Sequence, residues 1–260
     1  ELGDTLTAIA EDKSHVITGE QKCVYFAEQE PEVLEVLQRR AETLHIPYKI
    51  YGRDFHAENI RYTCFGMQFD VEIGDNIYAD LQIPLLGEHQ AKNCALALAV
   101  CVDVLSDLRR ESAVFSLPDI RKNLSLLHWP GRMEVLRSKP FVLLDACINA
   151  TSCENVKEVL RHLGVWNCTV IVGIPEDKDY AGVVRSMKGM ANRIILTRSG
   201  NPHYHFSQKQ QETLAEEDIG TIWTDSVKQA LTLAGSCPDP IVILGTTSVI
   251  SEVEQIFQQS

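Results

Sequence analysis

The sequence predicts an α/β fold in which a Rossmann-like C-terminal domain with a mostly parallel sheet follows a region with antiparallel strands. Four apolar runs after residue 132 carry the first part of this prediction: "FVLLD", "CTVIVGI", "RIILT" and "PIVILG". Helical stretches separate most of these runs, and such alternation is typical of a layered domain with parallel strands. The rhythm changes at the Pro-Gly turn of "HWPGR", so a domain boundary is expected at residues 124–132.

The region before this boundary combines helices with a predicted hairpin. A short helix should end near Gly19, and a strand should follow in "KCVYFA". Residues 30–45 place apolar side chains at helical spacing behind Pro31, which predicts a one-sided surface helix. Residues 60–86 hold β-prone runs on either side of a Gly-Asp-Asn turn at 74–76, so antiparallel strands are expected. The run "HQAKNCALALAVCVDVL" is apolar on nearly every side and predicts a buried helix.

Length, charge and cysteine content narrow the class of protein. The 260 residues carry a formal charge of −12, which argues against general attraction to nucleic acid or to anionic lipid. Eight cysteines without a CxxC pair predict the reduced thiols of a cytoplasmic protein. The longest apolar stretch is short and contains Asp103, and no charged-then-apolar leader is visible at Glu1. We therefore expect neither a membrane span nor secretion.

The stretch "FVLLDACINATSCENVKEVL" is a candidate site on physical grounds. Ligands of open α/β sheets bind at the carboxyl ends of strands, where Asp145 is expected and could accept hydrogen bonds from ribose hydroxyls. Thr151 and Glu154 fit a capping box, so a helix should begin there with its amides facing the loop. The alternative is structural: Asp145 caps a turn and Asn149 bonds its own backbone. These residues alone leave both interpretations open.

Several motifs occur in an order that is typical of one family. "LGDTLTAIAEDKSHVITGE" comes first, "LLGEHQAKNCALALA" follows, and "WPGRMEVL" comes shortly before "LLDACIN". In order and spacing they resemble the folylpolyglutamate synthase and dihydrofolate synthase family of the Mur ligase superfamily. "GIPEDKD" and "VILGTTSVISEVEQIF" resemble further segments of that family. The resemblance implies a partial Mur ligase central, ATP-binding domain over residues 1–127 and a Mur ligase C-terminal, glutamate ligase domain over residues 128–260.

The resemblance also implies an activity. Members of the family use MgATP to phosphorylate a folate or pteroate carboxylate, and the amine of L-glutamate then attacks the acyl phosphate to give an amide, ADP and phosphate. ATP and Mg²⁺ are therefore the expected cofactors, with L-glutamate and a folate or pteroate as substrates. Such a reaction needs cationic charge on the transferring phosphoryl group and a cleft closed against water. "HWPGRMEVL" favours the folate branch over ligases that act on cell-wall precursors.

Each expected site residue is carried over from a matching motif. Lys13 matches the family lysine that is often carbamylated near the metal and the phosphate, and a carbamate would be a carboxylate-like ligand for Mg²⁺. Gln90 and Asn93 match the family's HQ-x-x-N helix start, whose Asn approaches the adenine. Arg132 matches the PGR arginine, a phosphate contact whose guanidinium can bond two oxygens at once. Asp145 matches the aspartate of the D-G-A-H-N motif, which contacts the nucleotide.

The chain departs from the family pattern in three segments. Residues 145–149 read D-A-C-I-N where the family reads D-G-A-H-N. Asp145 and Asn149 therefore remain as expected nucleotide-binding residues, while Ile148, whose side chain forms no hydrogen bond, replaces the histidine. The small residues that follow the family lysine are changed to Ser and His after Lys13, and "NPHYHF" has no arginine where the family has one.

A phosphate loop of the form G-x-x-x-x-G-K-[S/T] does not occur in the sequence. The resemblance places that loop, with the family's metal-binding Glu and His, ahead of Glu1, so this chain by itself is expected not to transfer phosphate. The chain could be the C-terminal portion of a longer ligase, or another chain could supply the missing segment. The alternatives are a non-catalytic nucleotide-binding or regulatory module with the same fold and a ligase for a cell-wall precursor.

Overall fold

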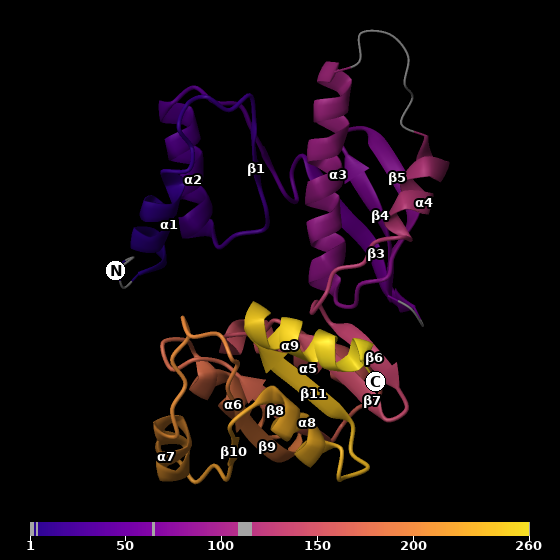
Figure 1. Cartoon of the computed structure of the whole chain (residues 1–260). Helices are drawn as coiled ribbons and strands as arrows, with labels where there is room; N and C mark the ends of the chain where they lie inside the picture. Colours follow the sequence, from indigo (N-terminus) through magenta and orange to yellow (C-terminus); the bar gives the residue numbers. More distant parts are fainter. Residues whose placement is uncertain (1–2, 4, 64–65, 109–115, 260) are drawn as a thin grey trace. The chain divides into compact units, whose positions relative to one another are not determined.

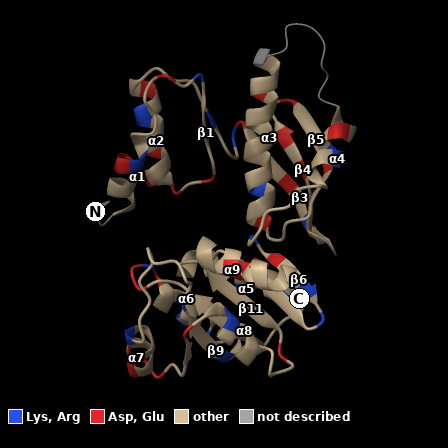
Figure 2. Cartoon of the chain, viewed as in Figure 1, with Lys and Arg blue, Asp and Glu red and all other residues tan. Residues whose placement is uncertain are grey.

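The computed structural model describes residues 3, 5–63, 66–108 and 116–259. The chain forms two compact units: unit 1 comprises residues 1–84 and 88–126, and unit 2 comprises residues 85–87 and 127–260 (Figure 1). Basic and acidic residues are interspersed along the chain in both units (Figure 2). Among the helices of the described residues, none combines the length and the apolar character that a membrane crossing requires.

The first half of unit 1 packs two helices with a small parallel sheet. Helix α1 (Leu6–Ser14) begins behind Thr5, whose hydroxyl oxygen accepts a first-turn N–H at 3.1 Å. Helix α2 (Pro31–Thr43) starts at its proline, because the first helical position needs no N–H. Strands β1 (Val24–Phe26) and β2 (Tyr48–Ile50) pair in parallel. The core of this half consists of Ile17, Phe26, Ala41, Ile46 and Ile50.

The second half of unit 1 is an antiparallel sheet covered by helices. Strands β3 (Phe55–Thr63), β4 (Gly66–Ile73) and β5 (Asn76–Ile83) pair in that order, which confirms the predicted hairpin between β4 and β5. Helix α3 (Glu88–Leu108) packs on β3 and β4, and α4 (Leu117–Leu124) packs on β5. Odd-numbered residues of β4 are buried, so its even-numbered residues face away from α3. Residues 64–65 of the predicted run lie outside the described part of the chain.

Asp103 is a charged residue inside the largely apolar α3. Its carboxylate accepts hydrogen bonds from Lys49 Nζ at 2.6 Å and from the Tyr25 hydroxyl, and so ties α3 to β1 and β2. Burial favours the protonated acid, but the bonds from Lys49 and Tyr25 outweigh it and lower the pKa of Asp103. The ion pair explains how this helix tolerates a charge.

Unit 2 is built on a six-stranded sheet in the order β10-β9-β8-β11-β7-β6. This mostly parallel sheet confirms the predicted α/β fold class, since neighbouring strands run parallel except for the antiparallel pair of β6 with β7. The four predicted apolar runs became β7, β8, β9 and β11. The strand bounds are Glu134–Ser138 for β6, Phe141–Asp145 for β7, Cys168–Gly173 for β8, Ala191–Thr197 for β9, Ile222–Thr224 for β10 and Ile241–Gly245 for β11.

The helices of unit 2 cover both faces of this sheet. Helices α8 (Val227–Ala234) and α9 (Thr247–Gln258) bury one face, together with Val142, Leu144, Ile171, Ile195, Ile241 and Ile243. Helices α5 (Ala150–His162) and α6 (Tyr180–Met187) pack on each other and on the alternate residues of the other face. Helix α7 (Lys209–Glu216) precedes the edge strand β10. Both faces are therefore apolar, as a parallel sheet requires.

Candidate functional site

Two loops diverge at the carboxyl edge of the unit 2 sheet. After β7 the chain enters α5, whereas after the neighbouring β11 it enters α9, which covers the opposite face. Open α/β sheets bind their ligands at the carboxyl ends of strands where the following loops diverge in this way. The structure brings three of the predicted residues to this edge, namely Arg132, Asp145 and Asn149. Lys13 and Asn93 belong to unit 1.

Asp145 ends β7 with a nearly buried carboxylate, which is 5% exposed. Its Oδ2 accepts the backbone N–H of Met133 at 2.9 Å. Burial raises the pKa of Asp145 to about 6, against the opposing effects of the Met133 N–H, the Arg132 charge and the Cys147 N–H. The carboxylate therefore holds two loop amides in place. This agrees with the structural interpretation of Asp145, in which the residue caps a turn.

The Pro-Gly-Arg turn is locked onto the end of β7. Gly131 has a positive φ of 63°, and an added Cβ would lie 2.5 Å from Cγ2 of Ile250 in α9. Its carbonyl accepts the Ala146 N–H at 2.8 Å, and its own N–H donates to Glu134 Oε2 at 2.7 Å. With Gly131 and Met133 both buried, the exposed Arg132 projects from a fixed backbone.

Asn149 corrects the predicted start of α5. The capping box with Thr151 was wrong, because the helix begins at Ala150 and Asn149 is its N-cap. The Asn149 Oδ1 accepts the Ser152 N–H at 2.8 Å and the Ser152 hydroxyl at 2.9 Å. Glu154 instead accepts hydrogen bonds from Lys157 Nζ at 2.8 Å and from the Ser186 hydroxyl. An asparagine competes well for this position, since its short side chain reaches the first-turn amides.

Asp179, the last residue of "GIPEDKD", joins the starts of two helices. Its Oδ1 accepts the Gly182 N–H at 2.9 Å and so caps α6, while its Oδ2 accepts the Ala150 N–H of α5 at 2.9 Å. The segment resembles the family in sequence, but no role was predicted for Asp179. The signal was present, because an aspartate three residues before Gly182 at a helix start is typical of an N-cap.

Two glycines let α9 start close against the sheet. Gly245 ends β11, and a Cβ there would lie 2.8 Å from the Gly173 carbonyl oxygen at the end of β8. Beyond them, the hydroxyls of Thr246, Ser248 and Ser199 form a chain with 3.0 Å steps. This small-residue edge lets the backbone approach closely and offers hydroxyl groups to a ligand.

A cavity of about 420 Å³ opens beside this edge. Its polar lining includes Arg198, Asn201 and Glu252, and its aromatic lining includes Tyr204 and Phe206. The Arg198 Nε donates to the Asp225 carbonyl at 3.0 Å, and its guanidinium lies 3.7 Å from the Asp225 carboxylate. The sequence prediction missed Arg198, since it directed attention to "NPHYHF", a few residues further along the chain.

Within unit 1, Lys13 and Asn93 are both exposed. Lys13 lies in the last turn of α1, next to the buried Ser14. Asn93 lies one turn into α3, where its Nδ2 donates weakly to Oε1 of the buried Gln90 at 3.4 Å. Lys92, which lies between Gln90 and Asn93 on α3, forms an ion pair with Glu28. Each predicted residue therefore presents a polar group at the surface of unit 1.

Comparison with known proteins gives a consistent set of relatives. Residues 1–101 match the model of the Mur ligase middle domain. The chain is 27% identical over 255 residues to folylpolyglutamate synthase from Lacticaseibacillus casei, a match that covers 98% of this chain and 58% of that protein. It is 24% identical over 259 residues to dihydrofolate synthase/folylpolyglutamate synthase from Bacillus subtilis, covering 98% of this chain and 59% of that protein.

A solved structure shares the fold. Mycobacterium tuberculosis folylpolyglutamate synthase complexed with ADP and AMPPCP matches with a TM-score of 0.85 and 22% identity, covering 100% of this chain and 61% of that chain. The chain thus spans somewhat less than two thirds of the length of these proteins. The chain is similar to folylpolyglutamate and dihydrofolate synthases, and the resemblance seen in its motifs is confirmed.

Proposed function

We propose that this chain acts in an ATP-dependent, ADP-forming ligase that joins L-glutamate to a pteroate or folate by an amide bond. In this proposal residues 1–127 are part of the ATP-binding central domain, and residues 128–260 are the glutamate ligase domain. The observation that carries the proposal is the exposed Arg132 on a turn fixed to the buried Asp145. A free guanidinium on a rigid backbone is suited to binding phosphate, because the turn needs no ordering on binding and the guanidinium can donate two N–H groups to phosphate oxygens.

Asp145 and Asn149 would complete the nucleotide contact. The Asp145 carboxylate already orients two backbone amides, so its direct part would be limited to its remaining lone pairs. Asn149 uses its oxygen to cap α5, which leaves its amide N–H groups to donate to ribose or phosphate oxygens. Ile148 is half-buried between them and makes this loop less polar than the family histidine would.

Lys13 and Asn93 would act from unit 1. A carbamate on the exposed Lys13 would add one oxygen ligand for Mg²⁺, whose other ligands would be phosphate oxygens and water. The metal supplies charge neutralisation at the transferring phosphoryl group. Asn93 has a carboxamide oxygen that could accept the exocyclic N–H of adenine, since its Nδ2 faces Gln90.

The cavity beside Arg198 would take the glutamate. The Arg198 guanidinium can pair with a carboxylate. The small residues around Gly200 leave room for a short side chain. Glu252 accepts the Gly200 N–H at 2.6 Å and would attract the substrate's ammonium group. In this proposal Arg198 replaces the arginine that the family has near "NPHYHF".

Product analysis tests the proposal. The chain would be incubated with MgATP, L-glutamate and dihydropteroate or tetrahydrofolate, alone and with a phosphate-loop polypeptide from a folylpolyglutamate synthase. The expected result is a product heavier by one glutamyl residue, with one ADP released per amide, in the second reaction only. Release of AMP, or ligation only to a cell-wall precursor, would contradict the folate assignment.

A non-catalytic nucleotide-binding module is the second candidate. Ile148 favours it, because that substitution removes one hydrogen bond from the expected nucleotide loop. The two candidates differ in one outcome: a module would bind ADP through Arg132 yet form no amide even when a phosphate loop is supplied.

A further inference from the structure

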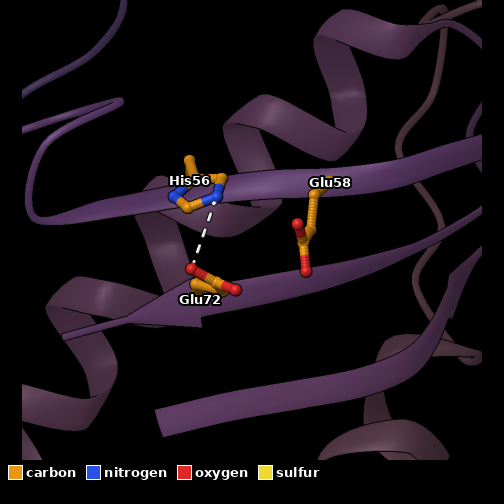
Figure 3. Close-up of side chains that lie close together, drawn as sticks. All are labelled: His56, Glu58 and Glu72. Carbon is orange, nitrogen blue, oxygen red and sulfur yellow. Dashed lines mark ion pairs between the residues drawn. The ribbon is translucent and has the colours of Figure 1, made fainter. Parts of the chain in front are cut away.

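The outward face of the antiparallel sheet in unit 1 carries a group of metal-binding side chains. Figure 3 shows His56 and Glu58 on β3 with Glu72 facing them from β4. The register places His56 directly opposite Glu72, and Glu58 lies two residues further along β3 on the same face. Three strand positions therefore converge without help from any loop.

The spacing of these groups is close to that of a coordination shell. The His56 Nε2 lies 3.5 Å from Glu72 Oε2, and one ligand atom from each of the three residues lies within 4.8 Å of the other two. Zn²⁺ with bonds of about 2.0–2.1 Å places tetrahedral ligand atoms roughly 3.3 Å apart. Small rotations of two glutamate side chains would therefore close the site.

The backbones that carry the ligands are held by the core. Phe55, next to His56, is 1% exposed, and Val71, next to Glu72, is completely buried. The three ligand residues themselves are half-buried, so water and ions can reach their polar atoms while the inner part of each side chain is restrained. Because this part is already ordered, less conformational entropy is lost when a metal binds.

The local charge favours a cation. Within the described residues, the Glu58 carboxylate has neither a hydrogen-bond nor an ion-pair partner. Asp70 lies opposite Glu58 on the same face, with its oxygens bonded to the Asn59 Nδ2 and the Asp80 N–H. Figure 2 shows acidic residues on both β3 and β4. A half-buried carboxylate without a partner, beside a second one, is stabilised when a cation binds.

We propose that His56, Glu58 and Glu72 form a binding site for a divalent transition-metal ion of the Zn²⁺ class. One imidazole nitrogen with two carboxylates is a donor set that suits Zn²⁺ and its neighbours better than Mg²⁺ or Ca²⁺, which prefer oxygen alone. A fourth position is open to water. The bound ion links β3 to β4 and stabilises the sheet of unit 1.

Calorimetric titration of the 260-residue chain with ZnCl₂ tests the site. We expect His56→Ala and Glu72→Gln each to weaken one binding event by at least about tenfold. Asp70→Asn is the matched control, because it removes the same charge from the same face but no ligand. Glu58→Gln is a further ligand variant, in case one substitution at His56 or Glu72 disturbs folding.

The outcomes are distinguishable from ordinary surface electrostatics and from binding by thiols. Unchanged Zn²⁺ affinity in His56→Ala would overturn the proposal, since the ion would then bind elsewhere, for example to cysteines. An equal loss in Asp70→Asn and Glu72→Gln would also overturn it, because a diffuse negative field would explain both. The titration uses neither nucleotide nor folate, so its result does not depend on the proposed ligase activity.

Discussion

Replacing Asp145 by Asn should stabilise unit 2 at neutral pH. Burial raises the pKa of this carboxyl from 3.8 to about 6, so its ionisation in the folded state costs about 3 kcal/mol above that pH. Asn is neutral and keeps an oxygen for the Met133 N–H, but it has one acceptor oxygen in place of two, and a weaker bond from the Cys147 N–H would cost about 1 kcal/mol. The net expectation is that Asp145→Asn raises the free energy of unfolding by about 2 kcal/mol at pH 8.

The sign of the pH dependence follows from the raised pKa. The folded state holds the Asp145 proton more tightly than the unfolded state, so the stability from the protonated acid is complete below pH 3.8 and is lost as the pH rises through about 6. The Asp145→Asn variant has no such loss, because its carboxamide does not titrate. The difference between variant and wild type should therefore increase by roughly 2.5 kcal/mol between pH 4 and pH 8.

Urea unfolding followed by tryptophan fluorescence measures this difference. Trp129, Trp166 and Trp223 are the three tryptophans of the sequence and all belong to unit 2, so the signal reports that unit. Asp177→Asn, at a side chain 63% exposed, controls for the loss of one negative charge. A variant-minus-wild-type difference that stays flat or decreases with pH would refute the reasoning about Asp145. A stabilising change at this position would also indicate that the carboxylate is kept for function.

Three further outcomes follow from the same geometry. Gly131→Ala should destabilise unit 2 by about 1–3 kcal/mol in the same urea assay, because Gly131 has a positive φ and an added Cβ would contact Ile250. Gly189→Ala should not destabilise the unit, because the space around Gly189 is open. Asp179→Ala removes the bonds to two helix starts and should cost about 1–2 kcal/mol; a loss no larger than that of Asp177→Ala would contradict the bridging role. The 260-residue chain alone should release no ADP from MgATP with dihydropteroate and glutamate, and sustained release in a coupled assay would show that these residues suffice for phosphoryl transfer.

The sheet of unit 2 could be predicted because its strands are buried on both faces. Continuous apolar runs such as "FVLLD" have few other stable arrangements once helices flank them. The edge strands β6 and β10 were missed because they are largely exposed and so lack a continuous apolar run, and β10 has only three residues. β2 was missed because it has only three residues and because its pairing with β1 depends on contacts between residues remote in the sequence.

The candidate site was only partly predictable. Motif order led to Arg132 and Asp145, but the bond from the Met133 N–H to the carboxylate depends on tertiary packing between the turn and β7. The start of α5 was misplaced because two local signals competed, and Asn149 formed the cap in place of Thr151. Arg198 and the His56, Glu58 and Glu72 group become visible only when strands and loops are assembled.

Calorimetric titration of the 260-residue chain with ADP tests the central claim most directly. If the Arg132 turn binds phosphate, the wild-type chain should bind ADP, and Arg132→Ala should weaken that binding by about 10- to 100-fold, the value of one lost charge-assisted bond or bidentate pair. Arg137→Ala, at another exposed arginine of unit 2, whose guanidinium lies over the Phe257 ring, should leave the affinity unchanged. Equal ADP affinity in wild type and Arg132→Ala would contradict the account.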